Sequence, residues 1–231
     1  MSNSKLDPEQ QVFAVVILGN FNPAIFHPLW YAQNGLIPEQ EIGDATDLVT
    51  TDEVSTFQLN DVHFQVERHR FGLTSKDPSK LPYLRDLAMG SFTLLEHTPL
   101  TALGLNSDFR FSLPSAEDWH AVGDRLAPKM CWASIIEKPG MLGVSMQGKR
   151  PDCPAARISI RLQPASGLDY GVFVAINQHY DIETEQRRSI ALRNAEVMRV
   201  LRDDWNSFRF FALNAAQAQI FEGQAAVGVT T

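Results

Sequence analysis

The chain has 231 residues, of which 44% are hydrophobic and 20% are charged, and its formal net charge is −7. This composition is typical of a globular protein and excludes an intrinsically disordered chain. The longest apolar run, Val12–Leu18, is too short to cross a membrane as a helix, and the polar start is unlike a signal peptide. Two cysteines cannot form a disulfide framework or a four-cysteine zinc site. We therefore expect a reduced, cytoplasmic protein that binds no cofactor and does not enter a membrane.

The charge is unevenly distributed along the chain. Residues 1–61 contain nine acidic residues and one lysine, whereas residues 137–161 contain five basic and two acidic residues. Such polarity can orient self-assembly or steer a charged partner, and a solvated surface is the plainer alternative. The acidic balance disfavours nucleic acid as a partner, because binding to phosphates requires a basic excess.

The first elements are predicted from apolar runs and prolines. Residues 1–11 are expected to be disordered, and the apolar run Val12–Leu18 predicts a buried strand. Pro23 and Pro28 predict a short turn followed by a helix that restarts at Pro28. The aromatic residues of the segment 21–31 favour core packing, with a ligand pocket as the alternative.

A hairpin and a helix are expected next. Strands at Val54–Leu59 and Val62–Arg70 flank Asn60-Asp61, a pair that is typical of two-residue hairpin turns. Pro82 opens a helix whose apolar stripe continues until His97-Thr98-Pro99 ends it.

The same order of elements then recurs. Leu100–Leu113 predicts an extended segment with a break at residues 106–108, and Ser115 begins a short helix with a capping-box pattern. The strands expected after this helix are Cys131–Ile136, Met141–Met146, Arg157–Gln163 and Gly171–Asn177. The first two are joined by a Lys-Pro-Gly turn at residues 138–140.

The absence of proline and glycine from about residue 183 to residue 221 predicts a long C-terminal helix. The clustering of strands between helices favours the α+β class, with antiparallel sheets covered by helices on one face. The sheets are either separate or merged into one curved sheet, built from two strand–helix–strands–helix modules. We expect a first module at residues 12–99, a second at residues 100–222, and a loose tail at residues 223–231.

Crowded aromatic residues on the C-terminal helix suggest an interface. Trp205, Phe208, Phe210 and Phe211 lie within two turns and point around more than half of the helix. Because one sheet cannot cover all these directions, part of the helix is expected to meet a protein partner or a second copy of the chain. The candidate interface residues are Val197, Leu201, Trp205, Phe208 and Phe211.

A second candidate site is a basic patch that could bind an anion. Residues 143–149 have the G-x-x-x-x-G-K spacing of a phosphate-binding loop, but the next residue, Arg150, lacks the hydroxyl that such loops use for magnesium. Pro151 also follows where a helix would have to begin. The spacing therefore predicts a strand that ends in a polar turn. The candidate anion-binding residues are Lys149, Arg150, Arg157 and Arg161.

Metal binding and catalysis find little support. The six histidines form none of the usual paired metal motifs, and no catalytic residue can be assigned. Cys131, inside a predicted strand, is expected to be a small buried hydrophobic residue. Cys153 lies in a predicted loop near basic residues, which can make a thiol reactive, but only His179 offers itself as a base.

Three stretches carry a resemblance to a known family: FNPAIFHPLWYAQNGLIPEQE at residues 21–41, LLEHTPLTALGLN at residues 94–106 and EKPGMLGVSMQGKRPD at residues 137–152. They resemble a sporadically distributed bacterial family of conserved hypothetical proteins of similar length. The resemblance implies no activity, cofactor or catalytic residue. Sporadic occurrence is typical of defence and toxin–antitoxin genes, so the resemblance implies such a setting by association.

Three functions follow as hypotheses. The sequence favours a non-enzymatic interaction or scaffold protein that oligomerises or docks a protein partner. The alternative is a protein that binds a small anionic ligand, or an unrecognised enzyme. The third and least favoured is binding of single-stranded nucleic acid on an exposed sheet.

Overall fold

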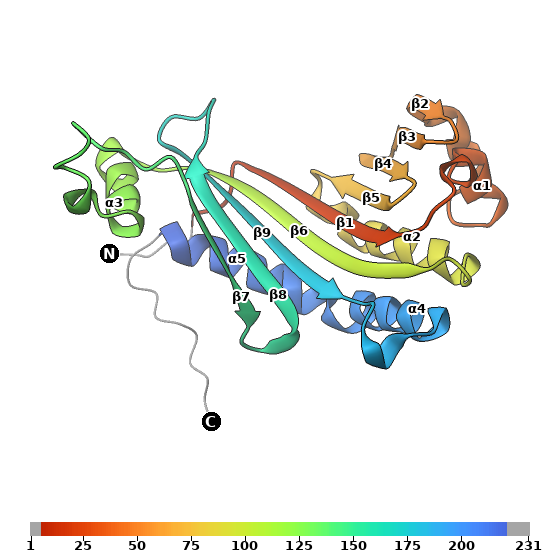
Figure 1. Ribbon diagram of the computed structural model, residues 1–231. Coiled ribbons are helices and arrows are strands. Elements are labelled where there is room, and N and C mark those ends of the chain that lie inside the picture. Colours follow the sequence, from red (N-terminus) through yellow and green to blue (C-terminus); the bar gives the residue numbers. More distant parts are fainter. Residues whose placement is uncertain (1–5, 221–231) are drawn as a thin grey trace.

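The computed structural model describes residues 6–220, which form a nine-stranded antiparallel sheet and helices of the α+β class (Figure 1). The sequence prediction of this class is confirmed. The strands are β1 (Gln10–Gly19), β2 (Thr46–Thr50), β3 (Val54–Leu59), β4 (Val62–Glu67), β5 (Arg70–Ser75), β6 (Leu100–Ser112), β7 (Val144–Arg150), β8 (Cys153–Pro164) and β9 (Gly171–Asp181). Their order across the sheet is β2-β3-β4-β5-β1-β6-β9-β8-β7.

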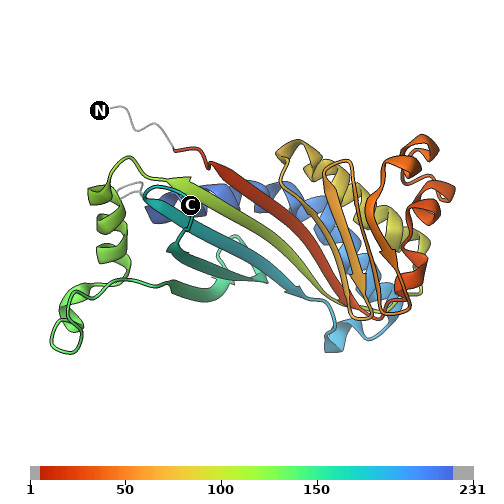
Figure 2. The same ribbon diagram turned by 90° about the horizontal axis from the view of Figure 1, so that it is seen from above.

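Four of the described helices cover one face of this sheet, and a fifth, α3, stands at its end (Figure 1). They are α1 (Pro28–Gln33), α2 (Leu81–Leu94), α3 (Ala116–Leu126), α4 (Ile190–Arg199) and α5 (Trp205–Ile220). Helix α2 packs on β1 and β5, α4 packs on β6, and α5 packs on β6 and β9. The strands β2–β5 bend away from the long strands β1, β6 and β9, so the sheet is strongly curved (Figure 2). Among the described helices, none has the length and apolar character needed to cross a membrane.

The sheet is continuous and has two halves of similar topology. The order β3-β4-β5-β1 is followed by β6-β9-β8-β7, so β1 and β6 meet at the centre and the strands of each half follow in reversed order. The first half has one further strand, β2, at its outer edge. The two modules have therefore merged into one curved sheet, and the module boundary at residues 99 and 100 stays a prediction.

Alternation along each strand separates the two faces. On β1, Phe13, Val15 and Ile17 are buried, whereas Val12 and Val16 are only partly covered. The buried side chains of both halves belong to one hydrophobic core. In the first half, the ring of Tyr31 lies 5.2 Å from that of Phe64 between α1 and the sheet. The aromatic residues near α1 thus form core, as the sequence favoured.

The first half differs from the prediction at three places. β1 begins at Gln10, and Leu6 packs against the core, so only residues 1–5 of the predicted disordered start lie outside the described residues. The predicted strand Val62–Arg70 is two strands, β4 and β5, separated by a turn at Arg68 and His69. β2 was not predicted, because its exposed residues show no buried alternation. The turn at Asn60-Asp61 is confirmed, with positive φ at both residues.

The second half contains the larger corrections. β6 runs without interruption through residues 106–108, where a break was expected, because β1 and β9 pair with it on both sides. The predicted strand Cys131–Ile136 is wrong: a 3₁₀ turn and irregular backbone occupy it, and Cys131 is exposed. The strand expected at Met141–Met146 is β7, which begins at Val144 and ends at Arg150.

The long C-terminal helix is confirmed in a shorter form. It begins at Ile190, where the Ser189 hydroxyl accepts a hydrogen bond from the backbone N–H of Leu192, and not at residue 183. A π-helical turn at Val200–Asp204 joins α4 to α5. The predicted tail at residues 223–231 lies outside the described residues.

Candidate functional site

The candidate interface on the C-terminal helix lies mostly inside the protein. Val197, Leu201, Trp205 and Phe208 are buried against the sheet. Phe211 is partly buried beneath the guanidinium group of Arg150, 4.7 Å from its ring centroid. Four of the five candidate interface residues are therefore covered by the chain itself, and an interface on this helix stays a prediction. The physical reason for this burial is the curvature and length of β6 and β9, which cover more of the helix than a flat sheet could. Only the neighbouring Phe210, at 74% exposure, points to solvent.

The candidate anion-binding residues do not form one patch. Lys149 and Arg157 are directly opposite each other on β7 and β8, and Arg161 lies on the same face farther along β8. Arg150 follows Lys149 in the strand, so its side chain points to the opposite, helix-covered face. The structure brings together three of the four predicted residues and separates Arg150 from them.

Arg150 is instead a buried structural residue. Its guanidinium group donates to both carboxylate oxygens of Asp152, to Gln178 Oε1 at 2.9 Å and to Ser207 Oγ at 2.8 Å. The pKa of the Asp152 carboxyl is held below its usual range by the hydrogen bonds from Arg150. Gln178 continues the network by donating to the hydroxyl of Tyr180. This network joins β7 and β9 to α5.

The other face of the long strands carries no helix, and we call it the open sheet face. Lys149, Arg157 and His179 form one row across β7, β8 and β9. Arg157 lies 3.7 Å from Asp181, and His179 lies 2.9 Å from the same carboxylate. The face is therefore basic but partly neutralised.

Farther along this face, the ring of Phe173 lies close to two arginines on the neighbouring strands. The guanidinium groups of Arg110 and Arg161 each lie 5.6 Å from the ring centroid of Phe173. Burial raises the pKa of the nearby Asp108 carboxyl, and the charges of Arg161 and Arg110 oppose that rise. A hollow of about 570 Å³ on this face contains Asp108 and Arg161 among its lining residues.

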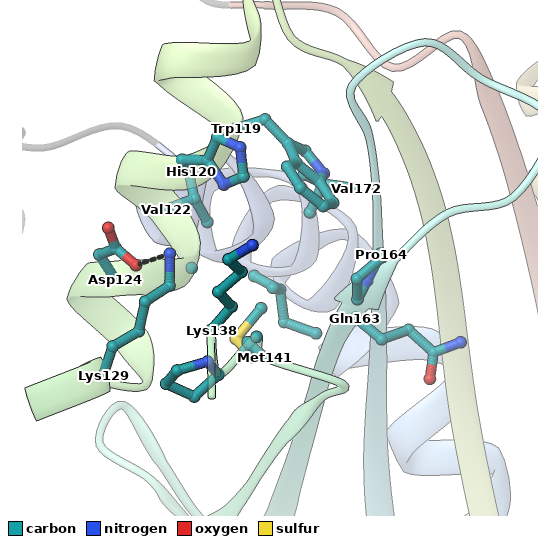
Figure 3. Close-up of a pocket in the computed structure, with 14 residues that line it drawn as sticks. Trp119, His120, Val122, Asp124, Lys129, Lys138, Met141, Gln163, Pro164 and Val172 are labelled. Carbon is teal, nitrogen blue, oxygen red and sulfur yellow. Dashed lines mark ion pairs between the residues drawn. The ribbon is translucent and has the colours of Figure 1, made fainter. Parts of the chain in front are cut away.

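A more apolar pocket of about 540 Å³ lies at the end of the sheet, beside α3 (Figure 3). Its walls come from α3, from the segment that precedes β7, and from the facing ends of β8 and β9. The apolar lining residues are Trp119, Val122, Pro139, Met141, Leu162, Pro164 and Val172. Such a concave, mostly apolar shape is typical of sites that bind a ligand or an anchoring side chain of a partner.

Five polar side chains also line this pocket: His120, Asp124, Lys129, Lys138 and Gln163. Lys129 lies 2.7 Å from Asp124 and is neutralised by it. Lys138 extends into the pocket in Figure 3 and forms no ion pair with any described residue. The pocket therefore combines an apolar wall with one unpaired cation, which fits an apolar group that carries a negative charge.

Helix α3 is capped at its first turn and is held in place by contacts with β9 and α5. The Ser115 hydroxyl caps its first turn by accepting from the backbone N–H of Asp118, 3.1 Å away. Trp119 Nε1 donates to the carbonyl oxygen of Gly171 on β9, 2.9 Å away, and Val122 is buried. Arg125 donates to the carbonyl oxygen of Gln219 on α5. The pocket wall formed by α3 is thus fixed to the sheet and to the C-terminal helix.

The segment between α3 and β7 exposes an unusual number of large apolar side chains. Residues 130–142, which we call the apolar loop, expose Met130, Trp132, Ile135, Ile136 and Leu142, with Met130 and Leu142 above 90%. These are five of the fifteen exposed large hydrophobic residues of the described chain, in thirteen residues. A smaller hollow of about 260 Å³ in this loop shares Lys129, Pro139, Gly140 and Met141 with the larger pocket. Loop and pocket form one surface.

The described residues show no arrangement that favours metal binding or cysteine catalysis. Within residues 6–220, no group of three or more His, Cys, Asp or Glu side chains could hold a metal ion. Cys153 Sγ lies 3.8 Å from the Tyr180 hydroxyl on the helix-covered face, whereas His179 lies on the open sheet face. The base that the sequence suggested for Cys153 therefore points away from it.

Sequence reasoning missed the apolar loop because it assigned Cys131–Ile136 to a buried strand. A usable signal was present in the residues that follow. The turn Lys138-Pro139-Gly140 separates two stretches in which apolar and polar residues do not alternate. A strand at the edge of a sheet buries only one face, so strands formed by these stretches would leave apolar side chains exposed.

A scan against models of known protein families finds none that matches this chain. A search of the curated proteins likewise finds no significantly similar sequence.

Proposed function

We propose that the protein is a non-enzymatic interaction protein that docks a protein partner through the apolar loop and the adjoining pocket. The observation that carries this proposal is the concentration of exposed large apolar side chains in residues 130–142. Monomeric proteins rarely expose large contiguous apolar patches, and such patches typically mark binding surfaces. The proposal keeps the function that the sequence favoured but moves the surface from the C-terminal helix to the segment before β7.

The chemistry of the surface specifies the partner. Ile135 and Leu142 offer apolar area, the pocket accepts one anchoring side chain, and Lys138 favours a partner with an acidic residue beside that anchor. We therefore expect the partner to present an aromatic or aliphatic side chain that is flanked by Asp or Glu. A setting in bacterial defence or in a toxin–antitoxin system is consistent with such a docking role and belongs to this proposal.

Site-specific photo-crosslinking tests the proposal in cells that naturally express the chain. A photoreactive residue at position 135 is expected to give a crosslinked species of discrete mass. The matched control carries the same residue at position 210, because Phe210 is as exposed as Ile135 but lies far along the chain on α5. A discrete product at position 135 that disappears in the Leu142→Ser variant supports docking. No product, or equal products at both positions, would contradict it.

The open sheet face favours a second candidate, the binding of a small anionic ligand. Lys149 and Arg157 are register neighbours, and Arg161 lies on the same face. A thermal-shift screen with nucleotides and phosphorylated metabolites tests this function, since a ligand at about 100 times its Kd stabilises the protein by about 2.7 kcal/mol. A rise in melting temperature that is lost in Arg157→Gln and Arg161→Gln supports this function. The absence of any rise with all tested compounds rejects it.

A further inference from the structure

The strand β7 lies at the edge of the sheet, with β8 as its one neighbour in the strand order. Its outward N–H and C=O groups form no backbone hydrogen bond with any other described residue. In the first half of the sheet, the corresponding edge of β3 is covered by β2. An uncovered edge is a template for pairing with another strand, which natural proteins usually protect.

The two edges of the sheet differ in how they are protected. β2 has five residues, its register shifts between Thr46 and Val49, and Asp47 has a positive φ of 52°. Such irregularity interferes with pairing at that edge. β7 has seven residues and keeps a regular register from Val144 to Lys149, without proline. The edge formed by β7 is therefore the one that can pair with a further strand.

The sequence of β7 is complementary to itself in the antiparallel direction. When two copies pair with Gln147 opposite Gln147, the five residues from Ser145 to Lys149 of each strand find a partner, and the register shift between Lys149 and Arg150 lies outside this stretch. Met146, which is 69% exposed, then faces Gly148, where no heavy atom lies within 4 Å of an added Cβ. The large side chain thus fills the space that the glycine leaves.

The charges of β7 allow this register. Lys149 faces the hydroxyl of Ser145 and not a second lysine. The two copies of Lys149 are four residues apart along the strands, roughly 13 Å, which exceeds the Debye length of about 8 Å at physiological salt. Arg150 is neutralised by Asp152 within its own chain.

We propose that two copies of this chain pair through β7 about a twofold axis at Gln147, so that their sheets form one continuous antiparallel sheet. An axis perpendicular to the sheet keeps the helices of both copies on one face and preserves the antiparallel alternation of all neighbouring strands. Closed twofold dimers are the commonest form of protein oligomer. The occupant of the β7 edge is thus a second copy.

The dimer has one consequence that depends on the proposed function. The apolar loop ends directly before β7, so antiparallel pairing places the two loops at opposite ends of the shared strands. They stay uncovered and are separated by at least the strand length of roughly 20 Å. A dimer would therefore present two partner sites and bind a bivalent partner with increased avidity.

Disulfide trapping tests the pairing. The variant Gln147→Cys in a Cys131→Ser background is expected to form a covalent dimer under mild oxidation, because facing Cα atoms in antiparallel strands lie about 4.5–5.5 Å apart, within the range for disulfides. Val49→Cys, on the other edge in the same background, is the matched control and is expected to remain monomeric. No covalent dimer of Gln147→Cys, or equal amounts in both variants, would overturn the pairing.

Charge substitution at the twofold axis gives an independent test that leaves the fold intact, since Gln147 is exposed. Sedimentation equilibrium is expected to show wild-type chains at twice the 25.8 kDa chain mass. Gln147→Glu and Gln147→Lys each place like charges opposite each other, and a one-to-one mixture of the two is expected to dimerise about 10-fold more tightly than either variant alone. A monomeric wild type, an assembly larger than a dimer, or a mixture no tighter than its components would overturn the proposal.

The photo-crosslink at position 135 separates this proposal from the proposed function. If Gln147→Glu abolishes the dimer but keeps the discrete product at position 135, both proposals hold. If the wild type dimerises but gives no discrete crosslinked product at position 135, docking is contradicted and the β7 pairing stands. If the product forms but the wild type is monomeric, the β7 pairing is contradicted and docking stands.

Discussion

The two halves of the sheet contain the same order of elements but finish their outer edges in different ways. In the first half, α1 lies over β3 and β4, and β2 extends the sheet by one strand. In the second half, α3 stands at the end of the sheet, and β7 has no outer neighbour among the described strands. The corresponding connecting segments are 20 residues (34–53) and 17 residues (127–143) long. Length therefore does not explain the difference.

The side chains near the two outer edges explain why the halves differ. The first half buries an aromatic cluster in which the rings of Phe57 and Phe64 are stacked 4.2 Å apart and Tyr31 contacts both. At the outer strands of the second half, the buried polar network around Arg150 takes the place of such rings. The large apolar residues of its connecting segment remain outside, in the apolar loop. The connecting segment of the second half thus exposes five large apolar side chains, whereas that of the first half exposes two, Leu48 and Val49.

The largest effect is expected from the aromatic cluster. Phe64→Ala removes a fully buried ring that packs on Phe57 and Tyr31, and we expect the free energy of unfolding to fall by about 3–5 kcal/mol. Denaturation by urea measures this change. A matched truncation in the second half, Trp119→Ala, removes a partly exposed ring and should cost clearly less. Equal losses would show that the two halves do not differ in core packing.

The next effect concerns the polar network of the second half. Arg150→Met keeps an apolar stem but removes the hydrogen bonds to Gln178 and Ser207, and we expect a loss of about 2–3 kcal/mol. Lys149→Met, on the neighbouring exposed position, is the control and should change stability by less than about 0.5 kcal/mol. Equal effects of the two variants would place Arg150 among the surface residues, contrary to its burial.

A smaller effect is expected from pH. Because Arg150 holds the pKa of Asp152 below its usual 3.8, the ion pair stabilises the folded state above that value and loses this contribution as the pH falls toward the lower folded-state pKa. Solvent at the exposed carboxylate limits the contribution to below about 1 kcal/mol. The unfolding curves of the wild type and Asp152→Asn should therefore differ at pH 7 and converge once the pH lies below the lowered folded-state pKa of Asp152. Parallel curves at all pH values would contradict the pair.

The sequence predicts the class and the helix-covered sheet because alternation and proline positions are local signals. Arg157–Gln163 and the turn at Asn60-Asp61 illustrate this, since each pattern alone defines its structure. The order of strands, and the merging of two modules into one sheet, depend on pairing between β1 and β6 that no local pattern encodes.

The candidate sites were harder to predict for the same reason. Lys149 and Arg150 look equivalent in the sequence, but the strand places them on opposite faces once it is known to extend to Arg150. Trp205 and Phe208 are exposed or buried according to the width of the sheet beneath them. The bounds of a strand determine the sheet face on which a side chain lies. How far that side chain is buried depends on tertiary packing.

The smallest effect on stability is expected from Leu142→Ser in the apolar loop. A matched substitution of a buried leucine in the first half gives the contrast. Leu142→Ser changes a side chain that is 93% exposed in the apolar loop, so the free energy of unfolding should change by less than about 0.5 kcal/mol. Leu73→Ser, in a fully buried position of β5, should cost several times more. Binding of a hydrophobic dye to the folded protein should fall only in Leu142→Ser. If this variant instead unfolds the protein, the loop belongs to the core, and its exposed residues would no longer be free for a partner.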